Sequence, residues 1–201
     1  MHLQPLIAPG FDDPVAGSQS VFRAAMNAMA RPGQRQTIPS LAQAPAPLVT
    51  SAAALLLALC DFETSVWLDP PLADTPAVME FVRFHTGVRV VALPTEAASA
   101  VISDTARMPA LASFCQGTAD YPDRSTTLIL QVKELKDIGW RFEGPGILGH
   151  VHFSAAPLPS DFPQQLQSNR ATFPRGVDIL FAGGGEIAAL PRSARLTKDA
   201  G

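Results

Sequence analysis

Apolar residues along the chain gather in short runs that alternate between the spacing of helices and the spacing of buried strands. The first run has helical spacing, and Ser18 can cap a helix over residues 19–30. The apolar residues at this spacing are Phe22, Ala25, Met26 and Met29. Arg31-Pro32-Gly33 then stops the helix. The pattern therefore predicts an amphipathic first helix with these four residues on its buried face.

A second predicted helix begins at Thr50 or Ser51 and ends at Leu59. Because its residues are apolar nearly all round, we expect it to be buried on more than one side. Thr75-Pro76 supplies a cap and a proline in the first turn of a third helix, which reaches about Phe84. Shorter helices are expected over residues 109–114 and 160–168.

Continuous apolar runs bounded by turn residues predict buried strands. The predicted strands are residues 65–69, 100–103, 126–132, 140–143, 151–153, 177–181 and 187–190. The run TTLILQV at residues 126–132 is the clearest, and its continuous apolarity favours a central position. We expect 140–143 and 151–153 to lie beside it.

Helices and strands alternate along most of the chain, and Gly183-Gly184-Gly185 then joins the last two strands as an antiparallel pair. This order predicts an α/β fold, a mixed β-sheet flanked by helices. The length of 201 residues fits a single domain over residues 1–201.

The composition points to a buried surface. The residues are 47% hydrophobic and only 16% charged, below the quarter or so of charged residues in an average soluble domain. A monomer rarely exposes large apolar patches, so a charge-poor surface favours a chain that packs against a partner.

Charge and hydropathy argue against nucleic-acid and membrane partners. The net charge is -3 and the Lys and Arg residues form no basic run, which disfavours phosphate neutralisation. The longest apolar stretch, Ala52 to Cys60, is about half of what a bilayer span requires. The N-terminal residues lack the pattern of a signal peptide, so we expect a cytoplasmic protein. Cys60 and Cys115 are far apart and are expected to be reduced and buried.

Two glycine-rich strings resemble phosphate-binding loops without meeting their requirements. Residues 144–149 match GxGxxG, but Pro145 has no N–H to donate and a strand follows where a helix is needed. Gly183-Gly184-Gly185 joins two strands and opens no helix, so a hairpin turn is favoured. The chain has no GxxxxGK[ST] motif.

His150 and His152 are spaced to point the same way from a strand, a geometry that some metal sites use. A third ligand would have to come from His85, a carboxylate or Cys115. A metal hydrolase is therefore one hypothesis, and surface or hydrogen-bonded histidines are its alternative.

Arg83, His85 and Arg192 are the candidate ligand-binding residues. Arginine suits an anionic ligand because its planar fork binds phosphate oxygens bidentately. Arg83 and His85 can instead complement the negative end of their own helix. We predict no catalytic and no metal-binding residues.

The motifs, taken in order, resemble those of the PhnH family, a subunit of the carbon-phosphorus lyase system for alkylphosphonates. The resemblance covers nearly the whole chain. It rests on Gly10-Phe11, Pro14-Val15, Ser18-Gln19-x-x-Phe22-Arg23-x-x-Met26-x-Ala28-Met29, Pro32-Gly33, Trp67-Leu68, Arg83-Phe84-His85-Thr86, Thr127 to Val132, Gly144-Pro145-Gly146-Ile147, Phe173-Pro174-x-Gly176-Val177-Asp178 and Ala189-Leu190-Pro191-Arg192.

The resemblance implies a fold similar to that of pyridoxal-phosphate-dependent transferases, without the cofactor. A Schiff-base enzyme needs a lysine of lowered pKa in its pocket. Lys133, Lys136 and Lys198 lie in polar stretches that do not predict such burial. We therefore expect no cofactor.

The resemblance also implies partnership with PhnG, PhnI and PhnJ, and a homodimer when the subunit is isolated. That complex is linked to the transfer of an alkylphosphonate to the ribose of ATP with release of adenine, followed by radical cleavage of the carbon-phosphorus bond. The chain lacks the cysteine motif of an iron-sulfur cluster. The main hypothesis is therefore a non-catalytic structural subunit. The alternative is a subunit that binds a phosphonate or nucleotide.

Overall fold

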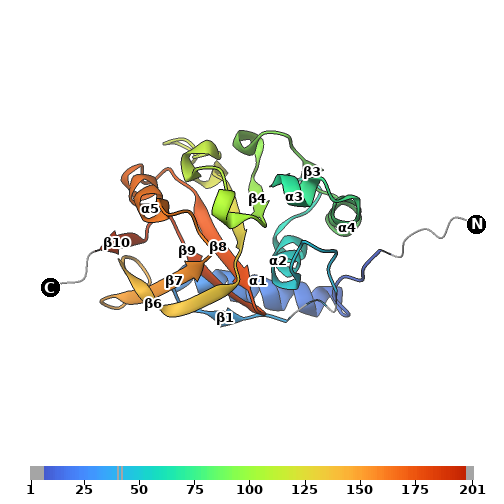
Figure 1. The fold of residues 1–201 in the computed structure, drawn as a ribbon, viewed down its shortest axis with the longest axis horizontal. Helices are drawn as coiled ribbons and strands as arrows, with labels where there is room; N and C mark the ends of the chain where they lie inside the picture. The colour runs from blue at the N-terminus through green and yellow to red at the C-terminus, as the bar shows by residue number, and fades with distance from the viewer. Residues whose placement is uncertain (1–6, 40, 42, 198–201) are drawn as a thin grey trace, which may run out of the picture.

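A seven-stranded sheet in the order β1-β9-β8-β5-β4-β2-β3 runs through the computed structural model, which describes residues 7–39, 41 and 43–197 (Figure 1). Its strands are β1 (Gln36–Thr37), β2 (Ser65–Leu68), β3 (Arg89–Val90), β4 (Ser99–Ile102), β5 (Thr127–Gln131), β8 (Asp178–Gly183) and β9 (Glu186–Leu190). Strands β3, β2, β4, β5 and β8 are parallel, whereas β9 and β1 are antiparallel to their neighbours. The predicted mixed sheet is confirmed, and β5 occupies its centre as expected.

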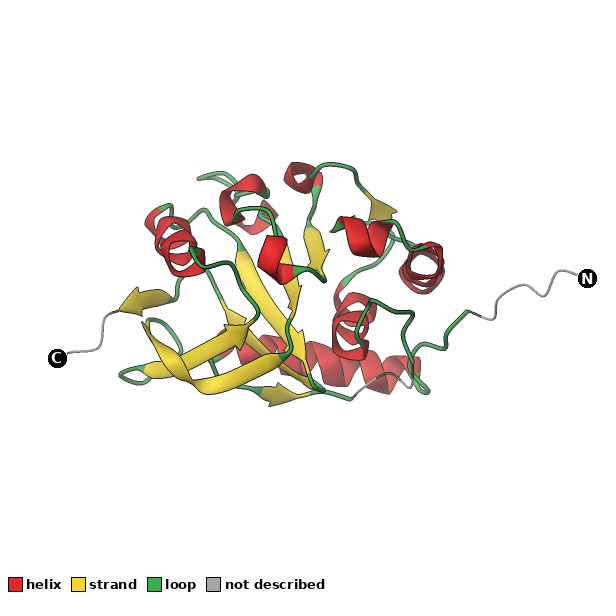
Figure 2. Cartoon of the chain, in the orientation of Figure 1, coloured by secondary structure: helices red, strands yellow, loops and turns green. Residues whose placement is uncertain are grey.

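Helices lie on both sides of this sheet (Figure 2). They are α1 (Pro14–Ala30), α2 (Thr50–Leu59), α3 (Pro70–Ala73), α4 (Pro76–Thr86) and α5 (Phe162–Ala171), with short 3-10 turns η1 (Pro94–Glu96), η2 (Thr105–Arg107), η3 (Leu111–Ser113) and η4 (Pro122–Arg124). None of the helices within the described residues is long and apolar enough to cross a bilayer.

Successive residues of the central strands belong to two different cores, because side chains alternate across a sheet. Ile129 packs with α1, α2 and α4 on one face. Leu128 and Leu130 pack on the other face with η3, α5 and Phe142 and Phe153 of a separate three-stranded sheet. The continuous apolarity of β5 therefore reflects burial on both faces.

The first helix begins earlier than its sequence pattern predicted. Pro14 is its first residue, and the Asp13 carboxylate accepts hydrogen bonds from the backbone N–H groups of Val15 and Ala16, both at 3.0 Å. Asp13, and not Ser18, is the cap. The predicted face is wrong for Phe22 and Met26, which are 49% and 54% exposed, whereas Ala25 is buried and Met29 partly buried, as predicted. The buried residues are Val21, Ala24, Ala25 and Ala28. These small side chains pack in the same core as α2.

The strands predicted to lie beside β5 form a separate sheet. β6 (Glu134–Glu143) pairs with β7 (Val151–Ala156) and with β10 (Arg195–Thr197) in the order β10-β6-β7. Both edges of β5 are already occupied by β4 and β8, so no position beside it remains. Phe153 of the second sheet instead packs on Phe181 of the first, with 5.3 Å between ring centroids.

Most of the remaining differences between the predicted and the observed elements concern short segments. The helix expected over residues 109–114 is wrong, because only the turn η3 forms there. The very short elements β1, β3, β10 and α3 were not predicted. The predicted turn at Gly183-Gly184-Gly185 is confirmed and joins β8 to β9. The GxGxxG string forms the loop between β6 and β7, where a Cβ on Gly146 would overlap the carbonyl oxygen of Ala30.

Candidate functional site

Arg192 lies at the start of the segment after β9, where it forms a largely buried ion pair. Its Nε and Nη2 donate to the two carboxylate oxygens of Asp178, the Nη2 contact being 2.5 Å, and its backbone N–H donates to the same carboxylate at 2.8 Å. Nη1 donates to the carbonyl of Pro122 at 2.5 Å. The guanidinium thus joins the start of β8 to the η4 loop.

Arg83 and His85 both lie in the last turn of α4, next to the left-handed Gly87 that ends the helix. Arg83 is exposed. His85 Nε2 is 2.9 Å from the carbonyl oxygen of Ala8, and its ring packs on Phe81 with 4.5 Å between centroids. His85 therefore attaches the segment before α1 to α4.

The structure does not gather these three cations into one site. Arg83 and His85 precede the edge strand β3, whereas Arg192 is paired with the first residue of β8. Strands β2, β4 and β5 separate β3 from β8. A ligand-binding role for Arg83, His85 and Arg192 stays a prediction.

His150 and His152 contact each other at the start of β7, with 5.2 Å between ring centroids. Within the described part of the chain, no group of three or more His, Cys, Asp or Glu residues is placed to hold a metal ion. His85 and Cys115 thus do not complete a cluster with them.

Cys60 and Cys115 are both free thiols. Burial raises the pKa of the Cys60 thiol from 9.0 to about 11, which keeps it protonated at neutral pH. Cys115 is only partly buried, and its thiol lies 3.2 Å from the carbonyl oxygen of Arg124. The prediction of a buried cysteine is confirmed for Cys60 alone.

Ion pairs at the surface connect the two sheets. Arg35 binds Asp137 of β6 at 2.8 Å and Glu186 of β9 at 3.1 Å, and the pKa of Arg35 is raised, chiefly by its hydrogen bond to Asp137. Within the three-stranded sheet, a hydrogen bond from Arg195 of β10 lowers the pKa of the Glu143 carboxyl of β6. Arg35 and Arg195 are exposed, Glu143 and Glu186 are partly buried, and all four are partnered, which is typical of structural contacts.

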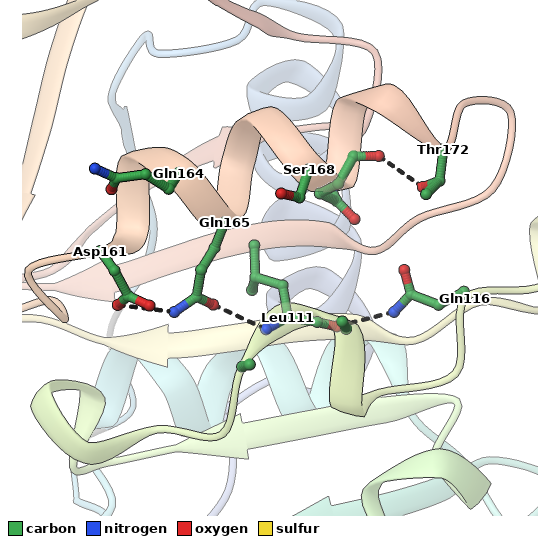
Figure 3. A pocket seen from close by; sticks show the side chains of 10 residues that line it. Leu111, Gln116, Asp161, Gln164, Gln165, Ser168 and Thr172 are labelled. Carbon is green, nitrogen blue, oxygen red and sulfur yellow. Dashed lines mark hydrogen bonds between the residues drawn. The ribbon is translucent and has the colours of Figure 1, made fainter.

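A cavity of about 330 Å³ lies between η3 and α5 (Figure 3). Its lining is rich in amides and hydroxyls: Ala110, Leu111, Ala112, Gln116, Asp161, Gln164, Gln165, Ser168, Asn169 and Thr172. Because no cation is among them, the cavity offers no ion-pairing group to a phosphate or phosphonate. Its chemistry suits a neutral ligand that both donates and accepts hydrogen bonds.

Most of the polar groups in this cavity already hold the protein together. Gln165 accepts from Leu111 N at 2.9 Å and donates to Asp161 at 3.0 Å (Figure 3). The Gln116 amide donates to the carbonyls of Leu111 and Phe114 at 2.8 and 2.9 Å. These amides fasten the η3 turn beneath α5, and Gln164 and Ser168 remain exposed at the opening.

Sequence reasoning missed this cavity. Amide side chains that bind backbone groups follow no motif, and Gln116 and Gln165 are far apart in the chain. The run of amides in residues 164–169 was the available signal, and it reads equally as the polar face of a surface helix.

Comparison with known proteins gives a consistent result. The family model of the bacterial phosphonate metabolism protein PhnH matches residues 9–197. The chain is 38% identical over 193 residues to the alpha-D-ribose 1-methylphosphonate 5-triphosphate synthase subunit PhnH of Rhizobium meliloti (strain 1021), covering 94% of each chain. It is 28% identical over 181 residues to the putative C-P lyase subunit protein HtxG of Stutzerimonas stutzeri, covering 89% of this chain and 85% of that one. The chain therefore belongs to the PhnH family of bacterial phosphonate metabolism proteins.

Proposed function

We propose that this chain is a non-catalytic structural subunit of a carbon-phosphorus lyase core complex. The observation that carries this proposal is the 38% identity, over 94% of both chains, to a subunit of the alpha-D-ribose 1-methylphosphonate 5-triphosphate synthase. The chemistry proposed for the assembly is transfer of an alkylphosphonate to the ribose of ATP with release of adenine, before the carbon-phosphorus bond is cleaved.

The side chains predicted to bind a ligand support a structural role for the subunit. Arg192 is held by Asp178, and His85 lies against the carbonyl of Ala8. Lys133 and Lys136 are exposed, as the sequence predicted, and Lys198 lies outside the described residues. We infer a fold related to pyridoxal-phosphate-dependent transferases, and the mostly parallel sheet with helices on both faces supports this inference.

The partners we propose are PhnG, PhnI and PhnJ, with a homodimer when the subunit is isolated. One candidate contact surface is the exposed face of α1. Val15, Phe22 and Met26 are 68%, 49% and 54% exposed, and their spacing places them along one side of the helix. We call these three residues the α1 apolar face, and we assign it to another subunit of the complex.

Co-expression with PhnG, PhnI and PhnJ tests the proposal. The chain is expected to co-purify with them, and synthase activity of the complex should be lost when the chain is omitted and return when it is added back. A chain that stays monomeric, does not co-purify and does not affect activity would contradict the proposal.

The alternative is a subunit that binds a phosphonate or nucleotide through Arg83, His85 and Arg192. It predicts that calorimetry with ATP or methylphosphonate detects binding, and that Arg83→Ala and Arg192→Ala each weaken it. Absence of binding to the isolated chain would remove the basis of this alternative.

A further inference from the structure

The sheet changes its direction of winding between β2 and β4. After β2 the chain passes to α3 and α4, and α4 packs on the face that carries α1 and α2. After β4 it passes to η2 and η3, and Leu111 of η3 packs on the opposite face. The two connections therefore diverge at the carboxyl ends of neighbouring parallel strands. In open α/β sheets, ligands bind in the crevice that such a divergence creates.

A cavity of about 420 Å³ lies at this position. It is lined by Pro47, Val49, Pro71, Ser103, Asp104, Thr105, Gln131, Val132, Lys133 and Pro157. Ser103 and Asp104 directly follow β4, and Gln131 is the last residue of β5. Its volume is within the range of small-molecule sites. We call this cavity the switch-point cleft.

Partly buried hydrogen bonds hold the walls of the switch-point cleft in place. The carboxylate of Asp69, after β2, accepts from the N–H groups of Ser103 and Asp104 at 2.7 and 2.8 Å. Gln131 accepts from Val49 N at 2.8 Å and donates to the Pro47 carbonyl at 3.1 Å.

The buried hydroxyl of Thr105 donates to the Pro157 carbonyl at 2.6 Å. These contacts tie the loop before α2, the segment after β4 and Pro157 to the carboxyl edge of the sheet. The cleft is largely preformed, so a ligand entering it orders little of the protein.

The lining pairs apolar walls with two charges at the rim. Pro47, Pro71 and Pro157 provide rigid apolar surface, and Val49 is 38% exposed. Lys133 is exposed, and its backbone N–H is anchored on Ala156 at 2.8 Å. Among the described residues, the ionic partner of Asp104 is Arg107, whose Nη1 lies 3.9 Å from the carboxylate. This distance is at the outer limit of an ion pair. The cleft therefore offers one cation, one carboxylate acceptor and apolar walls between them.

We propose that the switch-point cleft binds a small organic phosphate or phosphonate, with its anionic oxygens on Lys133 Nζ and its carbon skeleton against the proline walls. In a ligand that carries hydroxyl groups, Asp104 accepts a hydrogen bond from one of them. The choice of a phosphoryl or phosphonyl anion rests on the proposed function, whereas the position of the cleft does not. None of Arg83, His85 and Arg192 lines it.

Calorimetric titration of the purified chain tests this site with two probes. Methylphosphonate carries the anion alone, and AMP adds a ribose and a ring. Lys133→Met should weaken the binding of both probes by about tenfold or more, because a hydrogen bond to a charged group is lost. Lys136→Met is the matched control, since Lys136 is paired with Glu134 on β6 and does not line the cleft. It should leave both affinities unchanged.

Two further variants separate the roles of the lining residues. Asp104→Asn should weaken the binding of AMP, because the carboxylate that accepts from a ribose hydroxyl is lost. The affinity for methylphosphonate should stay equal or rise, because a negative charge near the anion is removed. Val49→Trp should block both probes by filling the cleft, with circular dichroism confirming the fold. Binding of neither probe, or equal loss in the Lys133 and Lys136 variants, would overturn the site. Co-purification with the other subunits would still stand, so the two proposals fail separately.

Discussion

Arg192 and Asp178 show how a paired charge can serve the fold. Their side chains are 14% and 15% exposed, and the guanidinium also binds the Pro122 carbonyl. Burying a charge without its partner raises the free energy of the folded state. Removing one member of the pair is therefore expected to destabilise the fold. Fourteen residues separate them in sequence, and only the pairing of β8 with β9 brings them together.

Asp178→Asn is expected to lower the free energy of unfolding by about 1–3 kcal/mol, because Arg192 would lose its charged acceptor while remaining largely desolvated. Urea unfolding followed by circular dichroism measures this change. Glu134→Gln, which breaks the exposed pair with Lys136, is the control and should have a much smaller effect. If the two variants lose the same free energy of unfolding, the buried pair stabilises the fold no more than an exposed one.

The thiol of Cys60 predicts a dependence of stability on pH. Its folded pKa is raised by burial from 9.0 to about 11. The unfolded chain therefore loses the proton first, and this contribution to stability is complete below pH 9 and is lost as the pH rises toward 11. Relative to Cys60→Ala, the wild-type chain should lose about 1.4 kcal/mol for each pH unit in that window. A difference between the two proteins that stays constant from pH 8 to pH 10.5 in urea unfolding would rule out this linkage.

At the scale of elements, the length of the apolar run decided what the sequence could predict. Runs such as TTLILQV of β5 carry enough residues for the period to be clear, and they were placed correctly. β1 and β3 have two residues each, too few for any periodicity. The apolar residues of β6 and β7 indicated strands, but local pattern does not specify which sheet a strand joins. That depends on the occupied edges of β5.

The candidate sites were harder to predict for the same reason. The walls of the switch-point cleft come from the ends of β4 and β5, from Pro71 and from the loop before α2, which are brought together only by the strand order. Lys133 was recognised from sequence only as an exposed lysine. That it lines the same cavity as Asp104 is a tertiary property.

The start of α1 provides a prediction at the scale of an element. Asp13→Ala should reduce the free energy of unfolding by about 1 kcal/mol, because the N–H groups of Val15 and Ala16 would lose their side-chain acceptor. Asp12→Ala removes the neighbouring carboxylate without touching the cap, and thermal unfolding should show little change. If Ser18→Ala destabilises the chain more than Asp13→Ala, the cap has been assigned to the wrong residue.

The whole molecule exposes large apolar side chains from several elements. Besides the α1 apolar face, Phe62 is 75% exposed, Phe84 68% and Leu93 56%. Single exposed apolar residues are ordinary, but three on one side of a helix are more than isolated cases. A chain with 16% charged residues has few charges to surround them. A surface of this kind is more consistent with a subunit than with a free-standing enzyme.

The α1 apolar face leads to a prediction about assembly. Phe22→Ser combined with Met26→Ser should weaken co-purification with the other subunits by about tenfold or more, since large buried side chains dominate interface energies. Because both residues are exposed in the isolated chain, its thermal unfolding should change little. Leu93→Ser is the matched control, removing an apolar side chain of similar exposure from another part of the surface. Loss of assembly in the Leu93 variant, with retention in the double variant, would move the interface away from α1 and toward the edge near β3.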